Sequence, residues 1–214
     1  MTCSEPPFLT SDVPGVGGQL RQRDTDFFVE EIPLYEPAGQ GEHIYLFVEK
    51  RGLSTSQLVH LIARHFGVRP SAVGYAGMKD KHAVTRQIIS VHTPRRTHAD
   101  FPMLENERVT VLNASMHANK LRLGHLRGNR FVVRIRGVDM SKAVPALRVL
   151  RTLETMGVPN FAGEQRFGSR QNNHRLGLAL IRKEWRPLLD ELLGPDPAFP
   201  HINADARALY AQRQ

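Results

Sequence analysis

The chain has 214 residues, of which 41% are hydrophobic and 23% are charged, and its 29 Lys and Arg residues outnumber its 21 Asp and Glu residues. These proportions are typical of a folded soluble protein and exclude disorder as its main state, because apolar residues recur along nearly the whole chain. No apolar run approaches the roughly 18 residues that span a bilayer, and residues 1–15 lack a secretory signal pattern, so neither a membrane protein nor a secreted one is predicted.

The first part of the chain alternates strand patterns with a helix pattern. Residues 1–20 are rich in Pro and Gly and predict an extended lead-in. Aromatic and β-branched runs at residues 26–32 and 42–49 predict two neighbouring strands. Residues 54–66 predict a helix, because Ser54 and Gln57 have capping-box spacing and apolar side chains recur on one face.

The rest of the chain predicts more strands and then helices. Strand patterns occupy residues 84–92, 108–114 and 121–137, and the last segment predicts two strands joined by a turn. Helical patterns then follow in three segments: residues 145–156, 176–181 and 187–193. The last two helices are predicted to be separated at Pro187. This order predicts a strand-rich α+β domain that is followed by the start of a helical one.

The densest chemical signal is the segment GYAGMKDKHAVT, residues 74–85. Its carboxylate, Asp80, lies between Lys79 and Lys81, on a loop that its glycines permit and that leads into a predicted strand. The flanking cations favour the ionised carboxylate, which suits a nucleophile or a base rather than a general acid. A solvated surface turn is the alternative that this pattern leaves open.

Other catalytic and cofactor-binding patterns lack support. The histidines have no partners at zinc-ligand spacing and predict surface or hydrogen-bonded side chains. Glu30 and Glu31 are adjacent on a predicted strand, so they face opposite ways and do not form an acid–base pair. Cys3 is the single cysteine, which excludes an internal disulfide and favours a reducing cytoplasm. There is no P-loop and no G-x-G-x-x-G, so no nucleotide cofactor is predicted.

The net charge of +8 favours a phosphate-bearing partner, although solubility alone is an alternative reason for it. Basic residues concentrate around Asp80 and in residues 120–136, and the aromatic residues Phe27 and Phe131 lie in or beside the same segments. Cations and aromatic faces together suit RNA with a splayed base, which stacks with about 1–3 kcal/mol per base. The alternative is that these aromatics belong to the core.

Three blocks of the sequence, GYAGMKDKHAVTRQ, KLRLGHLRGNRF and GVPNFAGEQRFG, resemble signature blocks of the TruD family of tRNA pseudouridine synthases in order and spacing, as does the strand segment TDFFVEE. The resemblance covers roughly residues 15–175. It implies an α+β fold in which a mixed or antiparallel sheet forms the pseudouridine-synthase catalytic domain. The implied organisation is a lead-in at residues 1–20, an incomplete catalytic domain at residues 21–155 and the beginning of the helical TRUD insert domain at residues 156–214.

The resemblance also implies an activity and the roles of individual residues. Asp80 would be the catalytic nucleophile that isomerises uridine to pseudouridine in tRNA, at uridine 13 of the D-arm, without a metal or another cofactor. The implied substrate-binding residues are Phe27, Asn129, Phe131, Arg21, Lys79 and Lys81. Phe27 and Asn129 would contact the target nucleotide and Phe131 would pack in the same cleft. The arginine would lie near the aspartate, and the two lysines would neutralise phosphates.

Two departures from the family pattern accompany the resemblance. Ala162 stands where the family has a large aromatic residue. Family members are also longer, and a later segment completes their catalytic sheet, so the chain is expected to be C-terminally truncated, with another segment or chain completing its sheet. A catalytically silent RNA-binding fragment of the same fold therefore stays open as an alternative, and an unrelated basic binding domain is a third.

Overall fold

The computed structural model describes residues 8–159 and 163–213, so Ala162 lies outside the described residues. Contacts divide the chain into two units, one formed by residues 14–147 and the other by residues 148–214 together with those before residue 14. No described helix combines the length and the apolar character that crossing a membrane requires.

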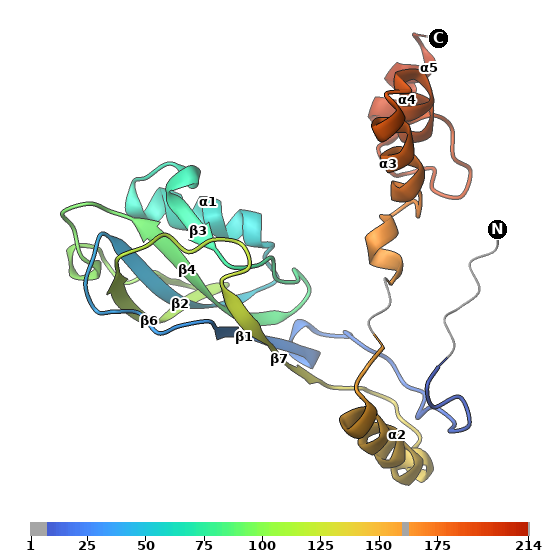
Figure 1. The fold of residues 1–214 in the computed structure, drawn as a ribbon, viewed down its shortest axis with the longest axis horizontal. Helices are drawn as coiled ribbons and strands as arrows, with labels where there is room; N and C mark the ends of the chain where they lie inside the picture. Colours follow the sequence, from blue (N-terminus) through green and yellow to red (C-terminus); the bar gives the residue numbers. More distant parts are fainter. Residues whose placement is uncertain (1–7, 160–162, 214) are drawn as a thin grey trace. The chain divides into compact units, whose positions relative to one another are not determined.

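A seven-stranded sheet is the framework of the first unit (Figure 1). Its strands are β1 Phe27–Pro33, β2 His43–Arg51, β3 Val73–Tyr75, β4 Val84–His92, β5 Glu105–Asn106, β6 Val109–His117 and β7 Leu126–Val133. They are ordered β5-β6-β2-β4-β1-β7, with β3 paired to β4. The β1–β4 pair is parallel and the other pairs are antiparallel. This confirms the predicted α+β class with a mixed sheet.

The helix α1, Thr55–Phe66, covers one face of this sheet (Figure 1). It begins as predicted, because the Gln57 amide donates to Ser54 Oγ (3.2 Å) and the Ser54 amide donates to Gln57 Oε1 (2.9 Å). It ends at Gly67, whose positive φ of 65° forms the C-terminal cap. Its apolar side packs against the buried side chains of β2, β4 and β6.

Strand alternation determines which side chains lie on the side of the sheet that α1 covers. Ile44, Leu46 and Val48 of β2 belong to the core beneath α1, and Lys50 is the next residue of the same alternation. Lys50 pairs with Thr85 of β4, and Thr85 pairs with Val29 of β1. Alternate residues of β1 and their β7 partners therefore share the side of the sheet on which α1 packs.

The strand β7 differs from its prediction, because residues 121–137 contain one strand rather than a turn-linked pair. Residues 121–125 follow the protein surface instead, held by tertiary contacts. Leu121 is buried with Ala76, and the Gly124 amide donates to the Ala76 carbonyl (2.8 Å). The partner of β7 is β1, and its other edge carries no strand in the described sheet. Phe131, Val132 and Val133 are 55%, 53% and 43% exposed there.

Helices dominate the remaining residues. They are α2 Ala143–Met156, which contains the boundary between the units, followed by α3 Asn173–Arg182, α4 Trp185–Leu193 and α5 Ala204–Ala211. The predicted break at Pro187 is wrong: Lys183 ends α3 with a φ of 59°, and Pro187 lies in the first turn of α4, where no amide donor is needed. Short 3-10 turns complete the fold: Asp24–Asp26, Pro70–Ala72, His98–Asp100, Met140–Lys142 and Glu164–Phe167.

Candidate active site

The carboxylate of Asp80 lies on the loop between β3 and β4. Its side chain is 36% exposed, and Asp80 Oδ1 accepts a hydrogen bond from Arg21 Nη2 at 3.3 Å. The two residues are 59 positions apart in the sequence. The structure therefore brings the predicted cation to the predicted nucleophile and leaves the carboxylate open to solvent.

Arg21 also joins the aspartate to the predicted aromatic residues. Its guanidinium carbon lies 3.8 Å from the centre of the Phe27 ring, close enough for a cation–π contact. Phe27 in turn meets Phe131 of β7 edge to face, with ring centres 6.0 Å apart. Asp80, Arg21, Phe27 and Phe131 thus form one continuous row of contacts, although they come from four separate segments.

Asn129 lies on the same side of β7 as Phe131, because the two are separated by one residue. Strand pairing places Asn129 opposite Glu31 and Phe131 opposite Val29 of β1. The Asn129 side chain is exposed. Its amide group is therefore available on the face that carries the row of contacts from Asp80 to Phe131.

The two predicted lysines have different environments. Lys81 is exposed beside Asp80. The side chain of Lys79 is buried, and its ammonium donates to Glu31 Oε2 at 2.7 Å, where the side chains are 4% and 1% exposed. Glu31 Oε1 also accepts from the Ile88 amide (3.3 Å). A phosphate role does not fit Lys79, because its ammonium already neutralises a buried carboxylate.

Further bonds fix the backbone of the Asp80 loop from the α1 side. The Thr55 hydroxyl accepts a hydrogen bond from the Lys79 amide at 2.8 Å. The ammonium of Lys50 donates to the carbonyl oxygens of Leu53 (2.6 Å) and Asp80 (2.8 Å). Lys50 is fully buried, and burial lowers its pKa from 10.5 to about 8, although the nearby Asp80 carboxylate opposes this shift. The loop is therefore held by residues of β2 and α1.

The segment that carries Arg21 is hydrogen-bonded to the residues that follow β7. The amides of Gln19 and Arg136 each donate to the other residue's carbonyl (2.8 and 3.0 Å). The Arg136 guanidinium makes two bonds of 2.7 Å to the buried carboxylate of Asp26, which holds the pKa of Asp26 below its ordinary value. Arg21 has a φ of 54°, a left-handed conformation that costs a non-glycine residue roughly 1–3 kcal/mol. These bonds hold the strained residue over Phe27.

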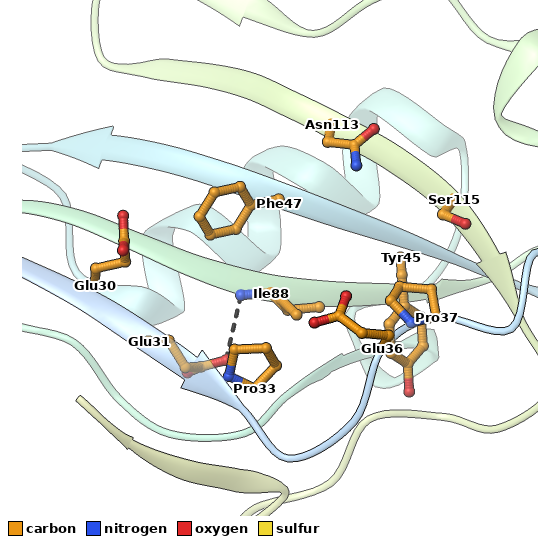
Figure 2. Close-up of a pocket in the computed structure, with 10 residues that line it drawn as sticks. All are labelled: Glu30, Glu31, Pro33, Glu36, Pro37, Tyr45, Phe47, Ile88, Asn113 and Ser115. Atoms are coloured by element: carbon orange, nitrogen blue, oxygen red, sulfur yellow. Dashed lines mark hydrogen bonds between the residues drawn. The ribbon is translucent and has the colours of Figure 1, made fainter. Parts of the chain in front are cut away.

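A separate hollow of about 260 Å³ opens on the opposite face of the sheet (Figure 2). Its lining residues are Glu30, Glu31, Pro33, Glu36, Pro37, Tyr45, Phe47, Ile88, Asn113 and Ser115. Figure 2 shows α1 behind the sheet and the bond from the Ile88 amide to Glu31. None of the seven predicted site residues lines this hollow, although Glu31, the partner of Lys79, does.

Comparison with known proteins identifies the family. Residues 6–214 match the family described as tRNA pseudouridine synthase D (TruD). The chain belongs to the TruD family. This confirms the resemblance carried by the sequence blocks, one of which contains Asp80.

Individual members of the TruD family are similar over most of this chain. The tRNA pseudouridine synthase D of Geotalea daltonii is 48% identical over 191 residues, which cover 89% of this chain and 48% of the relative. The Thermus thermophilus protein of the same name is 45% identical, over 83% of this chain and 49% of the relative. The crystal structure of the putative tRNA pseudouridine synthase D from Methanosarcina mazei matches with a TM-score of 0.69 and 31% identity, over 92% of this chain and 46% of that one. The chain thus spans about half the length of these TruD proteins.

The lowered pKa of Lys50 predicts a pH dependence of stability for this TruD-family chain. Between pH 8 and 10 the unfolded chain retains the Lys50 proton that the folded chain has released, so the free energy of unfolding rises with pH. The rise attributable to Lys50 is at most about 3 kcal/mol. Urea unfolding at pH 7, 8, 9 and 10 measures it, with Lys50→Met as the reference that lacks the group. Parallel curves for the two proteins would contradict the shift.

Proposed function

We propose that this chain carries the catalytic aspartate of a tRNA pseudouridine synthase that converts uridine 13 in the D-arm of tRNA to pseudouridine. The observation that carries the proposal is the row Asp80–Arg21–Phe27–Phe131, which combines an open carboxylate, a cation and two aromatic rings on one face. Membership of the TruD family supports the reaction class. A cytoplasmic location is proposed with it, since tRNA is modified there.

In this proposal the reaction is an isomerisation within one nucleotide. The bond between uracil N1 and the ribose C1′ breaks, C1′ bonds to C5 of the same base, the C5 proton leaves to solvent, and N1 takes up a proton from solvent. Asp80 acts as the nucleophile, through a covalent bond to the nucleotide that forms and breaks again within the reaction, and Arg21 orients its carboxylate. The target base must leave its stack, at a cost of a few kcal/mol, which stacking on an aromatic ring offsets.

The substrate-binding roles are proposed on the same geometry. Phe27, Phe131 and Asn129 would hold the flipped uridine, because they share one side of the sheet beside Arg21. Lys81 and the exposed arginines of β7 would neutralise the surrounding phosphates. Lys79 is assigned to the support of the loop instead, through its buried bond to Glu31.

The domain limits are proposed as the sequence predicted them, with an extended lead-in at residues 1–20, the catalytic domain at 21–155 and the beginning of the helical insert at 156–214. The helices α3, α4 and α5 support the helical assignment. The exposed apolar residues of β7 support completion of the sheet by another segment or chain. The length of the relatives, about twice the matched span, agrees with this.

Tritium release tests the proposed function. A tRNA transcript labelled at C5 of uridine is expected to release up to one equivalent of tritium from position 13 when it is incubated with the chain. The same transcript with cytidine at position 13 should release none. RNA binding that falls with salt but is accompanied by no release would contradict the proposal and favour the catalytically silent RNA-binding alternative.

A further inference from the structure

Lys50 is an unusual residue for a sheet interior, because lysines are rarely buried without a partner carboxylate. Its side chain is fully buried and follows three apolar side chains in the alternation of β2. The bonds of its ammonium go to two main-chain carbonyls, at 2.6 Å to Leu53 and 2.8 Å to Asp80. A buried cation thus lies directly beneath the backbone of the proposed nucleophile.

The two carbonyls belong to different segments of the chain. Leu53 belongs to the turn between β2 and α1, whereas Asp80 belongs to the loop between β3 and β4. The ammonium therefore ties the loop to the rigid junction at the start of α1. Thr55 adds a bond to the residue before Asp80, because its hydroxyl accepts from the Lys79 amide.

Asp80 is consequently held both by its main chain and by its side chain. Lys50 holds its main-chain carbonyl from within the fold, and Arg21 holds its carboxylate from the solvent side. A nucleophile must be placed within a fraction of an ångström of its productive position, and a displacement of about 1 Å lowers a rate by roughly 10²-fold. Loss of the inner contact would free the loop without removing any group that reacts.

We propose that Lys50 is a positioning residue of the isomerisation, which fixes the main chain of Asp80 so that its carboxylate meets Arg21 and the aromatic row. This inference rests on the proposed function, because it assumes that Asp80 is the nucleophile. Lys50 itself does not touch the reacting nucleotide. Its ammonium acts through the carbonyl of Asp80.

The test compares Lys50→Met with Lys142→Met, since Lys142 is exposed and lies in the same unit outside the site. Methionine replaces the apolar stem of lysine, is shorter only by the terminal nitrogen, and cannot donate to either carbonyl. In Lys50→Met, kcat for tritium release is expected to fall about 100-fold, with KM for tRNA within a few-fold of wild type. Lys142→Met should leave both unchanged.

Amide hydrogen exchange supplies a readout that does not depend on turnover. Exchange in residues 77–83 should accelerate at least tenfold in Lys50→Met, while the central strands β2 and β4 keep their protection. In a Cys3→Ser background, Lys50→Cys that is alkylated while unfolded to carry an aminoethyl group and then refolded restores the ammonium, and the same cysteine carrying a propyl group does not. Rescue of loop protection and kcat by the aminoethyl form alone is the expected result.

The outcomes separate the two proposals. A wild-type chain that binds RNA and releases no tritium contradicts the proposed function, while hydrogen exchange still decides whether Lys50 holds the Asp80 loop. Unchanged loop exchange and unchanged kcat in folded Lys50→Met would overturn the positioning role. Failure of Lys50→Met and of the propyl form to fold would overturn it too, because Lys50 would then be required by the whole fold.

Discussion

Replacement of Asp80 by asparagine is expected to abolish release of tritium from labelled tRNA. The carboxamide has almost the shape of the carboxylate, but it carries no charge and is a poor nucleophile. Arg21 loses its anionic partner and keeps its contact with the Phe27 ring, so the surrounding geometry is largely retained. The variant therefore removes the proposed chemistry and little else.

RNA affinity should stay within a few-fold of wild type in Asp80→Asn. Binding to phosphates depends on the exposed cations, which the substitution does not change, and loss of one negative charge near them would strengthen binding slightly. Single-turnover tritium release and filter binding at two salt concentrations measure the two properties separately. Turnover within tenfold of wild type would exclude Asp80 as the nucleophile.

Asp139→Asn provides a matched control for that experiment. Asp139 is exposed and caps the 3-10 turn Met140–Lys142 through its bond to the Ser141 amide (3.0 Å). Asparagine caps a helical turn about as well as aspartate, so the same chemical change should leave folding, binding and turnover unaffected. A loss of turnover in this control would show that the effect of Asp80→Asn is not specific to the site.

The sequence predicted those parts of the fold whose signals are local. The helix α1 is specified by its own capping box and apolar stripe, and its predicted start at Ser54 is confirmed. The segment 121–125 was misassigned because its alternation of apolar and polar residues has the period of a strand. Leu121 is buried, as that pattern predicts, but it is buried by tertiary contacts in a cluster with Tyr45 and Ile88 and not as part of a strand.

The same distinction applies to the site. The loop of Asp80 has a recognisable local sequence, and Arg21 and the aromatics follow from the resemblance of the flanking blocks. Lys50 was missed because its partners are backbone atoms of other segments, Leu53 and Asp80. The alternation Ile44, Leu46, Val48 in fact extends to Lys50 and could have placed a lysine on the buried face.

Lys79→Met is expected to lower the free energy of unfolding by about 3–5 kcal/mol, because it leaves the Glu31 carboxylate buried without its cation. Urea unfolding measures the loss. The control Lys142→Met removes an exposed pair with Asp139 at 3.7 Å and should cost at most about 1 kcal/mol. A loss from Lys79→Met no larger than that of the control would contradict the buried-pair assignment.

The double variant Lys79→Met, Glu31→Gln distinguishes the effect of the unpaired charge on stability from the effect of losing the packing of the lysine side chain. Glutamine keeps an acceptor for the Ile88 amide and removes the charge, so the double variant should be more stable than Lys79→Met alone.

The burial of Lys79 against Glu31 also predicts how RNA affinity depends on salt. Removal of exposed Lys81 should reduce the salt slope by about one, whereas removal of Lys79 should leave it unchanged in folded protein, because an ammonium paired with Glu31 releases no counterion from RNA.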